Sequence, residues 1–99
     1  MFNGERYITN GISATVPKFL QTILWYMIEI MPVEEKDYLQ VFELSEVVQD
    51  RKKKQKIIHF QEQPSFKEEV LITSKEILNL KIYIISGGSY STMLLSSEY

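Results

Sequence analysis

The stretch from Pro17 to Met31 constrains the fold most, because it holds much of the chain's large apolar volume between two prolines. Pro17 suits the first position of a helix, where its missing N–H has no partner to lose. Pro32 disfavours helical geometry at the residue before it and so ends the helix. A helix of this length is marginal in water by itself and is predicted to pack on the rest of the chain. Spacing of three and four residues predicts its apolar face to be Leu20, Ile23, Leu24, Met27, Ile28 and Met31.

Short runs of β-branched and aromatic residues make up most of the remaining chain, and turn residues separate them. Gly87 and Gly88 favour a tight hairpin, because glycine adopts positive φ freely. Residues 11–16 are predicted to be a connector, and a capping-box pattern at residues 73–76 predicts a single helical turn. Strands are predicted at residues 6–10, 38–47, 55–62, 66–73, 81–86 and 91–97.

One early helix followed by hairpins is typical of an α+β domain. We expect one main helix packed on a mainly antiparallel, twisted sheet of about five to six strands, with residues 1–99 as a single domain. The near-continuous apolar runs 70–72 and 82–85 predict central strands covered on both faces. Alternation along residues 38–44 places Leu39, Val41 and Glu43 on one face, and Tyr38, Gln40, Phe42 and Leu44 on the other.

Positive charge is concentrated in one segment of a chain whose net charge is −2. Without that segment, six basic residues face thirteen acidic ones, a balance of −7. A hairpin with lysines at its tip is predicted, where such lysines keep strand edges from aggregating. The alternative function is contact with nucleic acid phosphates. Two features argue against it: the rest of the chain is acidic and would repel a polyanion, and the cluster has no aromatic residue to stack on bases. The segment contains Arg51, Lys52, Lys53, Lys54 and Lys56.

The residue inventory argues against most enzymatic and metal chemistry. The chain has no cysteine, which excludes disulfides and thiolate sites and fits a cytoplasmic location. His59 is the only histidine, so we expect no metal site, no cofactor and no enzyme activity. A triad built from Ser89 or Ser91 with His59 and Glu62 lacks the Gly-x-Ser-x-Gly signal of a nucleophile turn. No apolar run is long enough to span a membrane.

A further pattern extends over nearly the whole chain, in residues 6–9, 17, 20–21, 25, 37–44, 56–59, 61–64, 91–95 and 98–99. Its clearest part is the strand motif Asp-Tyr-Leu-Gln-Val-Phe-Glu-Leu at residues 37–44. These segments resemble a small family from staphylococci and related Gram-positive bacteria, known as domain of unknown function nine-sixty. The resemblance implies a cytoplasmic protein linked to phage-like mobile elements, with no known activity and no catalytic residues to carry over. The lysine-rich run lies outside this pattern.

The function predicted first is a non-enzymatic protein-binding or regulatory module, because the surface carries more signal than any catalytic pattern does. We expect the partner to be an unidentified protein. Nucleic acid, bound through residues 51–56, is the alternative partner and is not favoured. No interaction with a membrane is expected. Strand order and oligomeric state are left open by the sequence. The candidate contact residues, expected to cluster on neighbouring strands, are Tyr38, Gln40, His59, Gln61 and Gln63.

Overall fold

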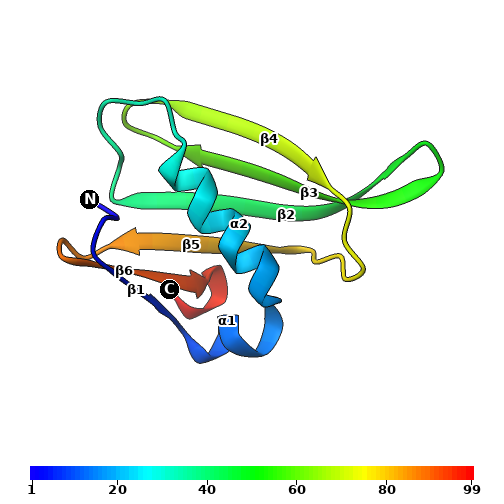
Figure 1. The fold of residues 1–99 in the computed structure, drawn as a ribbon, viewed down its shortest axis with the longest axis horizontal. Coiled ribbons are helices and arrows are strands. Elements are labelled where there is room, and N and C mark those ends of the chain that lie inside the picture. The colour runs from blue at the N-terminus through cyan, green and yellow to red at the C-terminus, as the bar shows by residue number, and fades with distance from the viewer.

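A computed structural model describes all 99 residues, which form a six-stranded open sheet with two α-helices on one side (Figure 1). The strands are ordered β1-β6-β5-β2-β3-β4, and every neighbouring pair is antiparallel except β1 with β6. The expected α+β fold is therefore confirmed in part, because strands dominate and the helices are short. The elements are β1 (Glu5–Ile8), α1 (Asn10–Thr15), α2 (Lys18–Glu29), β2 (Leu39–Gln49), β3 (Lys52–Gln61), β4 (Phe66–Ile72), β5 (Leu80–Ser86), β6 (Tyr90–Leu95) and the 3-10 helix η1 (Ser96–Glu98).

Helix α2 supplies one side of the core, as its apolar spacing predicts. Pro17 lies directly before it, and the Pro17 carbonyl accepts hydrogen bonds from the N–H groups of Leu20 and Gln21. In Figure 1, α2 crosses one face of the sheet. Neither α-helix is long and apolar enough to cross a bilayer. The side chains that form the core with α2 come from the facing side of the strands, chiefly Phe42, Ile57, Ile82, Ile84 and Met93.

Helix α1 replaces the connector that was predicted for residues 11–16. The Thr9 side chain caps it by accepting a hydrogen bond from the Ile12 N–H, and the Ile12 side chain is fully buried. A helix of six residues contains less than two turns, so no apolar period develops that a sequence pattern could detect. This expectation was therefore wrong for a simple physical reason.

Two further expectations fail at the β4 edge of the sheet. Residues 73–76 form no helix, because the buried Gln55 side chain holds the loop instead: its amide donates to the Leu78 carbonyl and its oxygen accepts from the Leu78 N–H. The apolar run 70–72 lies on β4, which is an edge strand rather than a central one. Its middle residue, Leu71, therefore faces solvent.

The β2–β3 hairpin extends beyond the other strands, as Figure 1 shows. Strand β5 pairs with β2 only as far as Leu44, and β4 pairs with β3 only from Gln55 onward. Residues 46–54 therefore form a two-stranded ribbon. Asp50 and Arg51 make its turn with φ of +52° and +67°, the positive values that a type I′ turn requires. The predicted hairpin is confirmed, although the lysines lie along β3 as well as at the tip.

The C-terminal segment is tied to the start of α1 by the Glu98 carboxylate. Thr9 Oγ1 donates to Glu98 Oε1 over 2.7 Å, and the N–H groups of Leu95 and Gly11 donate over 2.8 and 3.3 Å. The hydrogen bond from Thr9, followed by those from the backbone, lowers the pKa of Glu98 below its ordinary value.

Glu98→Gln is expected to lower stability at neutral pH, because it replaces a charged acceptor with a neutral one. A carboxyl whose folded pKa is lowered stabilises the fold above its unfolded pKa of 4.5 and loses that contribution as pH falls through the folded value. The gap between wild-type and variant melting temperatures should therefore close in acid. Thermal unfolding from pH 7 to about pH 3 measures it; a gap of constant size would contradict the assignment.

Trp25→Ala is expected to lower the free energy of unfolding by about 3–5 kcal/mol, because the Trp25 ring is only 8% exposed. The Arg6 guanidinium lies 4.8 Å from the ring centroid and ion-pairs with Glu29, which fixes the outer side of the ring. Tyr26→Ala is the matched control: Tyr26 is 57% exposed on the same helix and should change stability by no more than about 0.5 kcal/mol. Urea unfolding compares the two variants, and a loss below about 1 kcal/mol for Trp25→Ala would contradict the packing.

Candidate functional site

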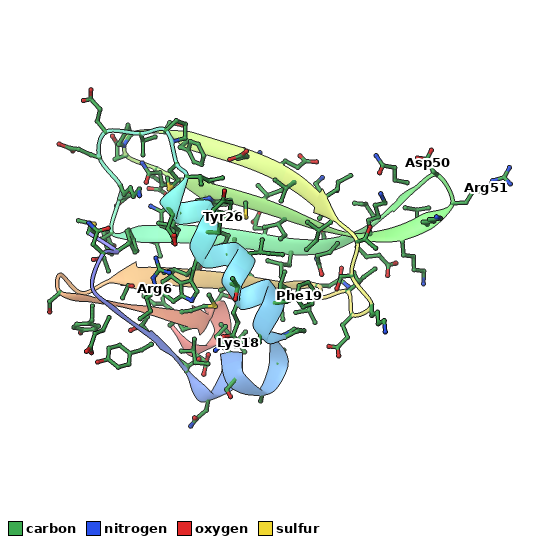
Figure 2. The ribbon with its side chains drawn as sticks, viewed as in Figure 1. Arg6, Lys18, Phe19, Tyr26, Asp50 and Arg51 are labelled. Atoms are coloured by element: carbon green, nitrogen blue, oxygen red, sulfur yellow. The ribbon has the colours of Figure 1, made fainter.

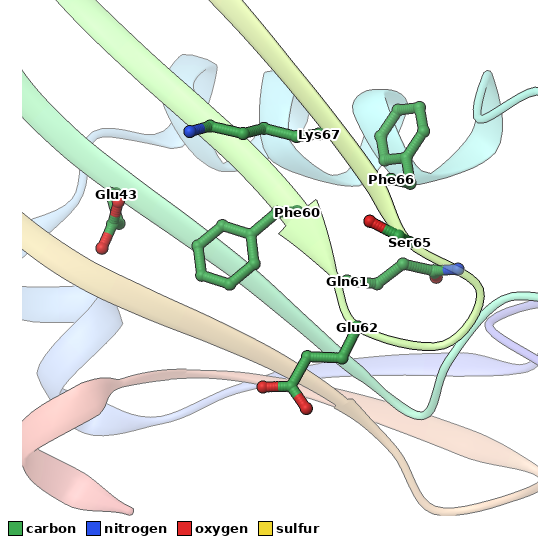
Figure 3. Close-up of a pocket in the computed structure, with 7 residues that line it drawn as sticks. All are labelled: Glu43, Phe60, Gln61, Glu62, Ser65, Phe66 and Lys67. Atoms are coloured by element: carbon green, nitrogen blue, oxygen red, sulfur yellow. The ribbon is translucent and has the colours of Figure 1, made fainter.

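The face of the sheet opposite α2 has no helix over it, and we call this surface the open face. In the close-up of Figure 3, α2 lies behind the strands and the open face is toward the viewer. Alternate residues of each strand point to it. Its members are Val41, Glu43 and Ser45 of β2, Lys54, Lys56, Ile58 and Phe60 of β3, Lys67, Glu69 and Leu71 of β4, Lys81, Tyr83 and Ile85 of β5, and Thr92 and Leu94 of β6.

A continuous apolar row crosses the open face. Phe60 pairs with Val41, Val41 with Tyr83, and Tyr83 with Leu94. Val41 and Leu94 are only 8% and 9% exposed, whereas Phe60 and Tyr83 are partly exposed. Tyr99 extends the row, with its ring edge-on to that of Tyr83 at 5.3 Å between centroids. The row offers partly exposed aromatic surface on a rigid support.

Charges of both signs flank the apolar row. Lys81 Nζ lies 3.7 Å from Glu43 Oε2, and Lys56 Nζ lies 3.2 Å from Glu69 Oε1. These pairs stand on either side of Ile58, in the row next to Phe60. The open face is therefore amphipathic, with neutralised ion pairs near its centre.

A shallow hollow of about 480 Å³ lies where β3 turns into β4 (Figure 3). The Phe60 ring forms its apolar part, and the carboxylates of Glu43 and Glu62 lie to either side of the ring. Lys67 also lines it, and its ammonium points away from Glu62. No three His, Asp or Glu side chains of the chain come close enough together to hold a metal ion.

Three of the five predicted contact residues lie in the interior. Gln40, His59 and Gln61 are at most 3% exposed and bind one another on the α2 side of the sheet. His59 Nε2 lies 2.7 Å from Gln40 Oε1, and Gln40 Nε2 donates to Gln61 Oε1 over 2.7 Å. The three side chains do cluster, but in a buried network, so they are not exposed on the surface as the prediction requires.

The buried network holds two loops against the sheet. Gln61 Nε2 donates to the carbonyls of Glu35 and Pro64, and its Oε1 accepts from the Asp37 N–H. Strand alternation indicates the burial of these residues, since Gln40 shares its face with Phe42, and His59 shares its face with Ile57. Tyr38 and Gln63, the other two predicted contact residues, are exposed.

The basic segment is divided by the alternation of β3. Lys52, Lys54 and Lys56 point to the open-face side, whereas Lys53 approaches Glu46 at 4.0 Å. Arg51 lies at the hairpin tip beside Asp50 (Figure 2). The five basic side chains therefore do not all lie on one side of the hairpin.

Ser91 and His59, two of the residues considered for a triad, form no hydrogen bond with each other. Ser91 Oγ and His59 Nδ1 are both buried without a hydrogen-bond partner, and His59 Nε2 is bound to Gln40.

Phe60 and Tyr83 of the apolar row were not predicted from the sequence as contact residues. An exposed stripe along α2 was not predicted either; Phe19 and Tyr26 belong to it (Figure 2), and Ile30 continues it at the end of the helix. Both surfaces lacked a signal because a strand or helix pattern shows which residues share a face but not which face is covered.

The buried state of His59 gives a pH dependence that can be measured. Its ring stacks on Phe42 at 4.3 Å between centroids, and burial lowers its pKa to about 4. Between the unfolded pKa of 6.5 and about 4, the unfolded chain binds a proton that the folded chain does not, so stability falls as pH falls.

Histidine ring NMR signals of the folded protein are therefore expected to stay constant from about pH 8 to pH 5. The accompanying loss of stability is at most about 1.4 kcal/mol per pH unit, the value for a single proton. His59→Phe should remove this component, because the chain has no other histidine. A titration midpoint near 6.5 in the folded protein would contradict the buried, neutral ring.

The comparisons with known proteins agree with this fold. Among solved structures, the crystal structure of a protein of unknown function from Enterococcus faecalis is similar, with a TM-score of 0.77 and 22% identity over 97% of this chain and 91% of that chain. At this identity the likeness shows the fold alone. No curated protein matches the chain. Residues 5–98 match the model of the family described as "Staphylococcal protein of unknown function (DUF960)". Because the match spans nearly every residue, and the segments that suggested this family lie mostly within it, the chain belongs to the DUF960 family.

Proposed function

We propose that the protein is a non-enzymatic, protein-binding module and that the open face is its contact surface. The observation that carries the proposal is the apolar row Phe60–Val41–Tyr83–Leu94, which crosses four neighbouring strands without a helix above it. Aromatic side chains on a rigid support are the usual anchors of protein interfaces. The proposal places this module in the cytoplasm, in line with a chain that has no cysteine.

Two features favour a protein partner over a nucleic acid. Glu43, Glu62 and Glu69 are interspersed with the lysines of the open face, so a polyanion lying on the surface would meet repulsive carboxylates. Lys56 and Lys81 are already ion-paired and have less attraction to offer phosphates. A mixed surface of this kind complements another mixed protein surface.

The stripe on α2 fits a docking surface less well than the open face does. Phe19 and Tyr26 are seven residues apart, which separates them by about 10 Å along the helix. Thr22 lies between them on the same side. Separate exposed apolar side chains are common on soluble proteins and need no partner.

A photo-crosslinking experiment tests the contact surface. Benzoylphenylalanine in place of Phe60, within the hollow, is expected to give a discrete covalent adduct when cells that express the full chain are irradiated. The same group in place of Tyr26, on the α2 side, should give none, because it faces away from the interface.

Folding of both variants is checked by circular dichroism. A folded Phe60 variant without an adduct would overturn the proposal, and an adduct from position 26 alone would move the contact surface to α2.

A further inference from the structure

We infer that the partner of the open face is a second copy of this chain, packed face to face about a two-fold axis that passes near Ile58. The inference rests on the proposed function and names the partner of the same surface. It follows from the order of charges along β3.

The open-face side chains of β3 change sign from one end of the strand to the other. Lys54 and Lys56 lie toward the hairpin, Ile58 and Phe60 lie in the middle, and Glu62 follows the strand in the hollow. Lys54 and Glu62 form no ion pair within the chain, whereas Lys56 is neutralised by Glu69. An unpaired cation and an unpaired carboxylate therefore lie four residues before and four residues after Ile58.

A two-fold axis converts this pattern into a complementary one. In an isologous contact, the residue four positions before the axis meets the residue four positions after it in the partner. Lys54 of one copy then faces Glu62 of the partner subunit, and Ile58 faces its own equivalent. Because of the symmetry, each such pair occurs twice.

The geometry of packed sheets allows this contact. Four residues of strand span about 13 Å, and a crossing of about 30° between sheets moves that end sideways by about 7 Å. Lys54 then stays over the hollow of the partner, where Glu62 lies and the Lys67 ammonium points away from it. Sheets pack about 10 Å apart, a distance that lysine and glutamate side chains can bridge together.

Sedimentation equilibrium of the full chain tests the inference. Wild type is expected to form a dimer, and Lys54→Glu or Glu62→Lys should each weaken it at least tenfold, because the symmetry places a like-charge contact at both ends. The double variant Lys54→Glu/Glu62→Lys should return to within about threefold of wild type, since the swap restores both pairs. Tyr26→Glu, on the opposite side of the molecule, is the control and should leave the dimer unchanged.

The possible results separate the alternatives. A wild type that remains monomeric at about 1 mM, single variants without effect, or a double variant that is not rescued would each overturn the second copy as partner. If the crosslinker at position 60 then captures another protein, the proposed function stands without the dimer, and if it captures nothing, both fall. Binding of a single-stranded oligonucleotide is the remaining alternative. If wild type binds the oligonucleotide while staying monomeric, and Lys54→Glu abolishes that binding, the surface is a nucleic acid contact instead.

Discussion

The packing of α2 against one face of the sheet is the interaction on which the rest of the structure depends. The apolar side of the helix, with Leu20, Leu24 and Ile28, meets the inward residues of β2, β3, β5 and β6 in one core. A chain of 99 residues has no second long helix to place on the other side of the six strands. The open face is the direct consequence, and its partly exposed aromatic row is what makes that face more than ordinary solvent-exposed sheet.

Buried polar side chains decide how the loops meet this core. Gln55 binds both backbone groups of Leu78. Gln61 binds backbone groups in the loop before β2 and in the loop after β3. A buried amide that satisfies several backbone groups is costly to disturb, because each lost bond leaves a donor or acceptor unpaired away from water. These glutamines therefore fix the outline of the sheet, including the turn that frames the hollow beside Phe60. In this way the interior network and the candidate contact surface are built by alternate residues of the same strand.

Electrostatics on the open face follow from the alternation of β3 rather than from the overall charge. The net charge of −2 conceals a strand whose outward side runs from lysine through isoleucine and phenylalanine to glutamate. Glu69 of β4 neutralises Lys56 of β3, and Lys81 of β5 pairs with Glu43 of β2 beside it. The unpaired charges that remain are Lys54 at one end and Glu62 at the other, with apolar side chains between them. A two-fold rotation brings each of these charges opposite the other in a second copy. The proposed protein recognition and the inferred self-association thus both depend on this one surface.

The sequence by itself determined the elements: the helix between the prolines, six strands near their observed positions, the lysine-rich hairpin, and the family. It also showed which residues share a face, since that depends only on the period of two along a strand. Tertiary structure alone decided which face is covered, that β4 is an edge strand, and that β1 runs parallel to β6, because these depend on contacts between distant segments. That difference explains why Gln40, His59 and Gln61 belong to the interior while Phe60 and Tyr83 look outward. The same local alternation fits either arrangement, and only the position of α2 selects between them.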